Sequence, residues 1–269
     1  LIGTLSGGLL AAMIYIPSFT EQVLGIAAEN SGYWMTPLAL AAGIGAGLGG
    51  MLVSKRGPVF TVVMSGLIAA IGFMLFPLWL ETRWQFIIAS AIAGVGIGVI
   101  LGAPLNILAT EGLKKDKGSA LASLSLLRQI GMTLAPAIYA GFIARAFNNM
   151  GTLFAEKFPG ILQQNLANVT LSAEAQAELA QIGQHMSSGG SGVSESELSG
   201  MLQAIQDPTL KQVLADSVGE ITKTAAQTGF SGLYWTAAIL GMAIIVGALV
   251  LIPLRKKSPQ DLEVTEETV

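Results

Sequence analysis

The sequence contains no cysteine and only one histidine, His185. The absence of cysteine excludes disulfides, thiolate nucleophiles and cysteine-ligated metals, and a single histidine excludes a site built from several imidazoles. The sequence also shows no nucleophile–base pair and no phosphate-binding glycine loop. We therefore expect no metal, no cofactor and no enzymatic activity.

Charged residues are also scarce, at 12% of the 269 residues, whereas soluble domains carry about 25%. The net charge of −3 argues against nucleic acid as a partner. Apolar residues make up 52% of the chain, and there are 33 glycines. This composition predicts a membrane protein in a lipid bilayer, with helices that pack closely through small residues.

Apolar runs predict the transmembrane helices, because a spanning helix needs about 20 mostly apolar residues. Six runs qualify, at residues 1–19, 33–53, 59–80, 84–109, 119–147 and 229–254. The predicted fold is an all-α polytopic membrane protein with a helical extracytoplasmic insertion. Its parts are helices one to five in 1–147, the insertion in 148–228, the last helix in 229–254 and a tail in 255–269. Leu1 lies inside an apolar run, so we expect the chain to be part of a longer protein.

Lysine and arginine are concentrated in the loops that would share one side of the membrane. These basic residues are Lys55, Arg56, Lys114, Lys115, Lys117, Arg255, Lys256 and Lys257. Because short cytoplasmic loops retain basic residues, both ends of the chain are predicted to be cytoplasmic. Residues 148–228 are then outside, and the expected location is the plasma (inner) membrane.

The polar segment 148–228 carries signals for short helices. Ser172 is placed to cap one helix, Ser194 and Glu197 have the spacing of a capping box, and Asp207-Pro208 begins another helix. Two interpretations are open: the helices pack only on themselves and the loop ends, or they guide a substrate or a partner.

Glycines recur at four-residue spacing in two predicted helices, which places them on one helix face. Gly43 and Gly47 share such a face in the second helix, and Gly94, Gly98 and Gly102 share one in the fourth. We expect both faces to pack against neighbouring helices. Such faces serve either static packing or sliding during a conformational change.

The turn between the second and third helices reads Gly50-Met51-Leu52-Val53-Ser54-Lys55-Arg56-Gly57-Pro58. It resembles the signature loop of the major facilitator superfamily, G-x-L-a-D-R-x-G-R-[RK]. The resemblance makes Gly50, Leu52, Lys55 and Gly57 candidates for a conformational loop. Ser54 replaces the acidic residue, and Pro58 and Val59 replace basic ones, as is usual in the second copy of this loop.

Further runs resemble the fourteen-helix drug–proton antiporters of that superfamily. They are Tyr15 to Gly25, Pro37-Leu38-Ala39, Gly118 to Ser123 and Arg128-Gln129-Ile130-Gly131. The resemblance covers about residues 1–147 and 229–257 and implies the carboxy-terminal six-helix half of a multidrug exporter. Implied partners are the amino-terminal half, small lipophilic or cationic substrates, and protons, with antibiotic resistance as a consequence. An exporter of a lipid, siderophore or metabolite, or a membrane scaffold or receptor, is the alternative.

Polar and aromatic residues inside the predicted helices are candidates for the substrate or proton pathway: Tyr15, Phe19, Glu21, Gln22, Asn106 and Arg128. Arg128 either pairs with a carboxylate of the other half or extends toward the cytoplasm. Glu21 either titrates beside the bend expected at Pro17 or is an ordinary interfacial residue. The remaining candidates either line a cavity or contribute to helix packing.

Overall fold

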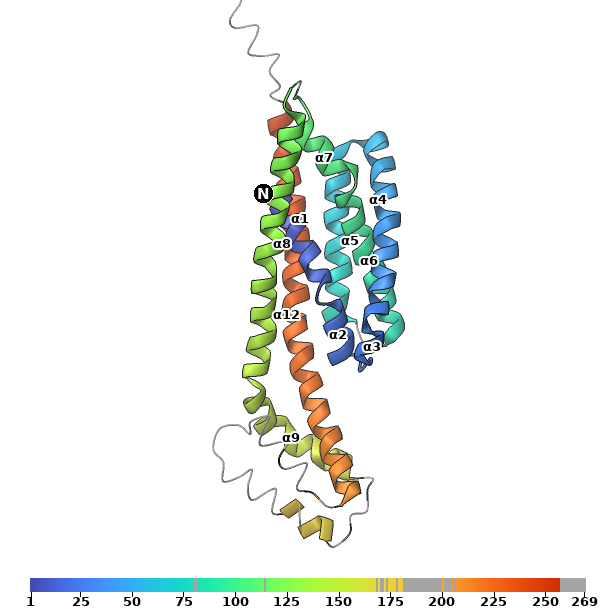
Figure 1. The fold of residues 1–269 in the computed structure, drawn as a ribbon, viewed down its shortest axis with the longest axis vertical. Coiled ribbons are helices and arrows are strands. Elements are labelled where there is room, and N and C mark those ends of the chain that lie inside the picture. The colour runs from blue at the N-terminus through green and yellow to red at the C-terminus, as the bar shows by residue number, and fades with distance from the viewer. Residues whose placement is uncertain are drawn as a thin grey trace, which may run out of the picture. The chain divides into compact units, whose positions relative to one another are not determined.

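The computed structural model describes residues 1–79, 82–113, 115–167, 169, 172, 174–177, 179–180, 200, 205 and 207–256. Within these ranges the chain is helical and contains no β-strand (Figure 1). His185 and the pair Ser194 and Glu197, which was predicted to form a capping box, lie outside the described residues. The all-α fold predicted from the sequence is confirmed.

Six helices in the described part of the chain are long and apolar enough to cross a membrane. They are Ile2–Gln22, Ala28–Arg56, Pro58–Leu78, Arg83–Thr110, Lys117–Asn148 and Pro208–Leu251. Each one overlaps a run that was predicted from hydropathy, so the number and order of the predicted spans agree with the structure.

Two of the spans are broken rather than continuous. The first consists of α1 (Ile2–Met13) and α2 (Ile16–Gln22), and the fourth consists of α6 (Arg83–Leu101) and α7 (Ala103–Thr110). In both cases a proline, Pro17 or Pro104, lies in the first turn of the second piece, where its missing N–H is tolerated. Gly102 joins α6 to α7 with a ψ of −140°, outside the helical range.

The second, third and fifth spans are more regular. The second begins with α3 (Ala28–Ser31) and the 3₁₀ turn η1 (Gly32–Met35), and continues as α4 (Thr36–Arg56). The third is α5 (Pro58–Leu78) and the fifth is α8 (Lys117–Asn148), which is followed by α9 (Met150–Leu166).

The last helix, α12 (Pro208–Lys256), starts well before the predicted position at residue 229. Asp207 caps it by accepting hydrogen bonds from the backbone N–H groups of Thr209 and Leu210, at 2.8 and 3.0 Å. Pro208 occupies the first helical position, as predicted, and no further proline interrupts the next 44 residues. The apolar run predicted from residue 229 is therefore the later part of one helix that is continuous from Pro208.

The chain divides into two compact units, which are described separately. The bundle unit comprises Leu1–Gly141 together with the chain from Ser231 onward, and the insert unit comprises Phe142–Phe230. In the bundle unit, helices meet through backbone contacts at small residues. A Cβ on Gly94 or Gly98 of α6 would collide with the carbonyl oxygen of Leu38 or Ala42 of α4.

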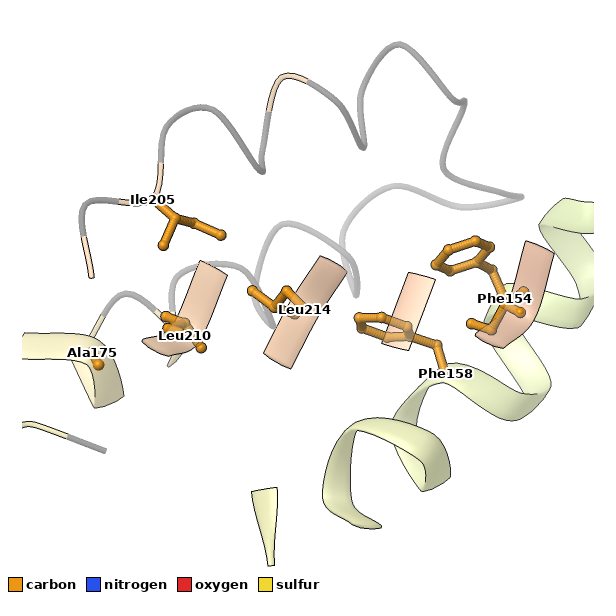
Figure 2. Close-up of a cluster of buried hydrophobic side chains, with 7 residues drawn as sticks. Phe154, Phe158, Ala175, Ile205, Leu210 and Leu214 are labelled. Carbon is orange, nitrogen blue, oxygen red and sulfur yellow. The ribbon is translucent and has the colours of Figure 1, made fainter. Parts of the chain in front are cut away.

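The insert unit has its own apolar core (Figure 2). Its buried residues are Phe154, Phe158, Ala175, Ile205, Leu210, Leu214 and Ile221. Hydrogen bonds supplement this core: Asn165 Nδ2 donates to Ser217 Oγ at 3.0 Å, and Ser172 Oγ donates to Asp207 Oδ2 at 3.1 Å. Ser172 also accepts from the backbone N–H of Ala175, which confirms its predicted capping role.

Candidate functional site

Helices α1 and α8 of the bundle unit meet along a tight seam (Figure 1). A Cβ on Gly7 would collide with the carbonyl oxygen of Arg128, and a Cβ on Gly131 would collide with that of Thr4. A Cβ on Gly3 would lie 2.9 Å from Cδ1 of Leu124. Because only glycine allows this spacing, the backbones of α1 and α8 meet directly at the level of Arg128.

Two tyrosines join the same helices further along the seam. Tyr15 Oη donates to the carbonyl of Pro136 at 2.9 Å, and Tyr139 Oη donates to the carbonyl of Gly8 at 2.9 Å. The two rings meet edge to face with centroids 5.9 Å apart. Tyr15, a predicted pathway residue, is therefore half-buried and holds the break between α1 and α2 against α8.

Arg128 lies on α8 at the level of this seam and is half-buried, and two nitrogens of its guanidinium group have no partner in the described structure. Its Nε and Nη2 atoms are buried and make no hydrogen bond. Helix α1, which lies opposite, has no acidic residue between Ile2 and Met13. The seam therefore holds a cation without a counter-charge from this chain's described helices.

Phe19 lies in a packed aromatic cluster rather than on an open surface of this chain. Its exposed fraction is 3%, and its ring contacts Phe76, Phe86 and Tyr234 with centroid distances of 5.8, 6.0 and 5.5 Å. Phe73 extends the cluster by stacking on Tyr234 at 6.1 Å. In this arrangement Phe19 ties α2 to α5, α6 and α12, which corresponds to the packing alternative of the sequence analysis.

Three other predicted pathway residues lie apart from the seam. Gln22 and Asn106 are exposed, and Glu21 is half-buried in α2. No hydrogen bond among the described residues involves the side chain of Gln22 or Asn106. The structure therefore brings Tyr15 and Arg128 to one interface, whereas these three residues are not joined to it by any described contact.

The conformational-loop candidates lie where α4 turns into α5. Gly57 is the single residue between the two helices, and its φ of 83° with ψ of 167° is a conformation that only glycine adopts readily. Lys55 is exposed, Leu52 is half-buried, and Gly50 has open space beside its Cα. Arg56 lies over the Phe60 ring, with its Cζ 5.1 Å from the centroid.

The predicted glycine faces differ in their outcome. Gly94, Gly98 and Gly102 of the fourth span do contact α4, at Leu38, Ala42 and Ala46. A Cβ added to Gly43 or Gly47 of α4 would have no neighbour within 4 Å, whereas Gly45 and Gly49 press on Val95 and Val99. Within this chain the packing face of α4 is therefore that of Gly45 and Gly49, and the packing role of Gly43 and Gly47 stays a prediction.

Sequence reasoning missed most of the aromatic cluster and one buried hydroxyl. Phe73, Phe76, Phe86 and Tyr234 come from three spans, and only the i, i+3 spacing of Phe73 and Phe76 gives a local signal. Ser90 Oγ is buried without a hydrogen-bond partner in the described structure. The described residues contain no group of three histidine, aspartate or glutamate side chains that could hold a metal ion.

Comparison with known proteins gives a family for this arrangement. The family model for the Major Facilitator Superfamily matches residues 1–136. The chain is 44% identical over 245 residues to YfiU of Bacillus subtilis (strain 168), an uncharacterized MFS-type transporter. The aligned region covers 91% of this chain and 43% of YfiU. It is 27% identical over 272 residues to the multidrug transporter protein MdtP of the same organism, covering 98% of this chain and 47% of MdtP.

A third relative matches a shorter part of the chain. It is a triacylglyceride transporter of Mycolicibacterium hassiacum, 29% identical over 162 residues, which cover 55% of this chain and 30% of that protein. The chain spans about half the length of YfiU and MdtP. Since the family model matches half of a chain whose described part holds six candidate membrane spans, this multi-pass membrane protein belongs to the Major Facilitator Superfamily.

Proposed function

We propose that the chain is the carboxy-terminal half of a secondary transporter that exports drug-like or toxic compounds in exchange for protons. The observation that carries the proposal is the match to the multidrug transporter MdtP, which extends over 98% of the chain. A match of that extent includes the insert unit, whereas the match to the triacylglyceride transporter covers 55% of the chain. The fourteen-helix arrangement belongs to the same proposal.

Uneven burial of the spans supports a second half beside this one. In the spans Ala28–Arg56 and Lys117–Asn148, only 22% of the apolar window is buried, against 56% in Pro58–Leu78 and Arg83–Thr110. The faces of α4 and α8 left open are apolar: Leu40 and Ile44 are exposed on α4, as are Leu134 and Ile138 on α8. We assign these faces to lipid and to the amino-terminal half, which together would cover them.

The proposed orientation follows from the basic residues and places the insert unit outside the cell. The α4–α5 turn with Lys55 and Arg56 is cytoplasmic, as are both ends of the chain. Residues 148–228 are extracytoplasmic, residues 229–254 form the membrane part of α12, and residues 255–269 are a cytoplasmic tail. The membrane is the plasma (inner) membrane.

The proposed pathway runs along the broken first span. Interrupted helices allow irregular backbone to line a cavity at membrane depth, so the breaks at Tyr15 and Gly102 are places where polar groups can face a substrate. Glu21 and Gln22 follow the first break, and Asn106 follows the second. The described spans contain no acidic residue deeper than Glu21, so the main proton carrier is assigned to the amino-terminal half.

The test is efflux of ethidium from cells that express the full-length gene product. We expect efflux above the empty-vector level that disappears when a protonophore collapses the proton gradient. Efflux at the empty-vector level, with the protein verified in the membrane, would contradict drug export. Export of a fluorescent triacylglyceride in the same cells would instead favour a lipid exporter, the second candidate, which the match to the triacylglyceride transporter supports.

A further inference from the structure

Arg128 is the one charged residue in the interior of α8. The other charged residues of this 32-residue helix, Lys117 and Arg145, lie at or near its ends. At 1.5 Å per residue, Arg128 is about 16 Å from Lys117 and about 26 Å from Arg145 along the helix axis. These distances place its Cα well inside the span.

The guanidinium of Arg128 is not fully exposed. An arginine that reaches for the membrane surface exposes its guanidinium group. In Arg128, Nε and Nη2 are both buried. These two atoms of the guanidinium are therefore covered by protein, on a residue whose backbone carbonyl lies against Gly7.

The two buried atoms form one functional edge. Nε–H and Nη2–H lie side by side on the planar guanidinium, and this pair matches the two oxygens of a carboxylate. Neither atom has a hydrogen-bond partner in the described structure. An unsatisfied charged donor at membrane depth is costly. We therefore expect an anion to bind the guanidinium of Arg128 during part of the transport cycle.

The helices around Arg128 cannot supply that anion. Helix α1 has no acidic residue, α8 has none, and α12 has none between Ser231 and Leu251. These three helices therefore leave the anion to another source.

We propose that the Nε and Nη2 edge of Arg128 is a carboxylate-binding site at membrane depth. The carboxylate belongs either to the other half of the transporter or to an anionic substrate. The half-buried side chain reaches it by turning out of the seam, because its present position is closed by neighbouring atoms. If the carboxylate is a substrate group, the cargo includes organic anions, which differ from the cationic drugs expected from the resemblance. Only the possibility that a substrate supplies the carboxylate rests on the proposed export function.

The experiment uses the purified full-length protein with Arg128→Lys, Arg128→Met and the control Arg145→Met. Lysine keeps the charge, methionine keeps much of the apolar volume, and Arg145 is exposed on the same helix. Two quantities are measured: the melting temperature without ligand, and the dissociation constant for carboxyfluorescein, with ethidium as the cationic probe.

Two outcomes support the site and separate its sources. If the carboxylate is a protein group, Arg128→Met lowers the melting temperature by several degrees. Arg128→Lys, which keeps the charge but loses the paired donors, lowers it less, and Arg145→Met stays near the wild-type value. If the carboxylate belongs to the substrate, Arg128→Met leaves the melting temperature unchanged or raises it, and weakens carboxyfluorescein binding by about tenfold or more. In that case ethidium binding is unchanged or tighter.

Two other outcomes overturn the proposal. Wild-type behaviour of Arg128→Met in both measurements would show that no anion depends on Arg128. Equal losses in Arg128→Met and Arg145→Met would show that the effect is not specific to Arg128. Both measurements are independent of efflux. If the efflux test contradicts drug export, the proposal that a protein carboxylate binds Arg128 is still tested by the melting temperature.

Discussion

The bundle unit and the insert unit use opposite means to hold helices together. In the bundle unit, glycines such as Gly45, Gly98 and Gly131 press on the backbone of a neighbouring helix. In the insert unit, a Cβ added to Gly160, Gly200 or Gly219 would have no neighbour within 4 Å, and large side chains such as Phe158 form the core. Gly229, at the end of this unit, is the exception, since a Cβ there would lie 2.9 Å from the Cα of Ile143.

The difference follows from the solvent expected around each unit. Between helices in lipid there is no hydrophobic driving force, so close van der Waals contact and small residues decide the packing. In water, removal of apolar surface contributes about 25 cal/mol per Å², so large apolar side chains form the core. The two packing styles thus agree with a membrane position for the bundle unit and an aqueous one for the insert unit.

The largest expected effect comes from adding a side chain at a glycine contact of the bundle unit. Gly98→Leu places a side chain against the backbone of Ala42, so α4 and α6 must separate. Overpacking costs about 1–3 kcal/mol in ordinary cores and more where backbone blocks relaxation. We expect loss of the monodisperse peak of the full-length protein in size-exclusion chromatography.

The matched variant for this prediction is Gly219→Leu in the insert unit. Gly219 lies on an exposed part of α12, and a side chain added there would have open space around it. Leucine also favours the helix over glycine by about 0.8 kcal/mol. We expect an unchanged elution profile. Similar damage from both substitutions would remove the contrast between the units.

Truncation of the insert core should have the next largest effect, confined to that unit. Phe158→Ala removes a ring that is buried beside Phe154, and such changes cost about 3–5 kcal/mol. Limited proteolysis should then cut rapidly within residues 142–230, while the bundle unit stays protected. Lys157→Ala, at an exposed neighbouring position, is the control and should resemble the wild type.

A smaller effect is expected from removing one hydrogen bond of the α1–α8 seam. Tyr139→Phe deletes the donor to the Gly8 carbonyl and costs about 0.5–1.5 kcal/mol. A modest fall in melting temperature should result, while Tyr33→Phe, at an exposed residue, should leave it unchanged. No fall for Tyr139→Phe would mean that the backbone contacts alone fix the seam.

The smallest effect concerns the cap of α12. Hydrogen bonds from the backbone N–H of Leu210, then from Ser172 and from the N–H of Thr209, hold the pKa of Asp207 below its ordinary value. A lowered pKa in the folded state gives stability that is present above the unfolded pKa, which is about 3.9, and is lost as pH falls through the folded pKa. Protease protection of the insert unit should therefore decrease in acid.

Asp207→Asn separates this titration from the cap itself. Asparagine retains a capping oxygen but does not titrate in this range. Between about pH 7 and about pH 3, a range that includes the unfolded pKa, protease protection of the insert unit should change less in Asp207→Asn than in the wild type. Parallel curves for both proteins would assign the acid effect to other carboxylates.

Hydropathy predicted the membrane spans well because length and apolarity are local properties of the chain. The third span was predicted at residues 59–80 and is Pro58–Leu78 in the structure. The start of α12 at Asp207-Pro208 was predicted from local signals, but its continuity with the apolar run from residue 229 was not. Burial of Leu210 and Leu214 in the insert core stabilises the early part of the helix, and hydropathy does not measure that contribution.

Packing faces were harder to predict than spans. Gly43 and Gly45 differ by two residues, which is a rotation of about 200° around a helix. A run of alternating glycines therefore offers opposite faces with equal spacing, and only the position of α6 selects Gly45 and Gly49. Likewise, Arg128 was identifiable as an unusual charge, but its unpartnered edge depends on the approach of α1.

The single-residue connection at Gly57 has a consequence for biogenesis. Only one residue separates Arg56 of α4 from Pro58 of α5, and this connection is too short for the two helices to enter the bilayer at separate times. The two spans must insert as a helical hairpin, with Gly57 setting the reversal through its positive φ. A β-branched residue at this position would therefore impair membrane integration itself, before any transport step is reached.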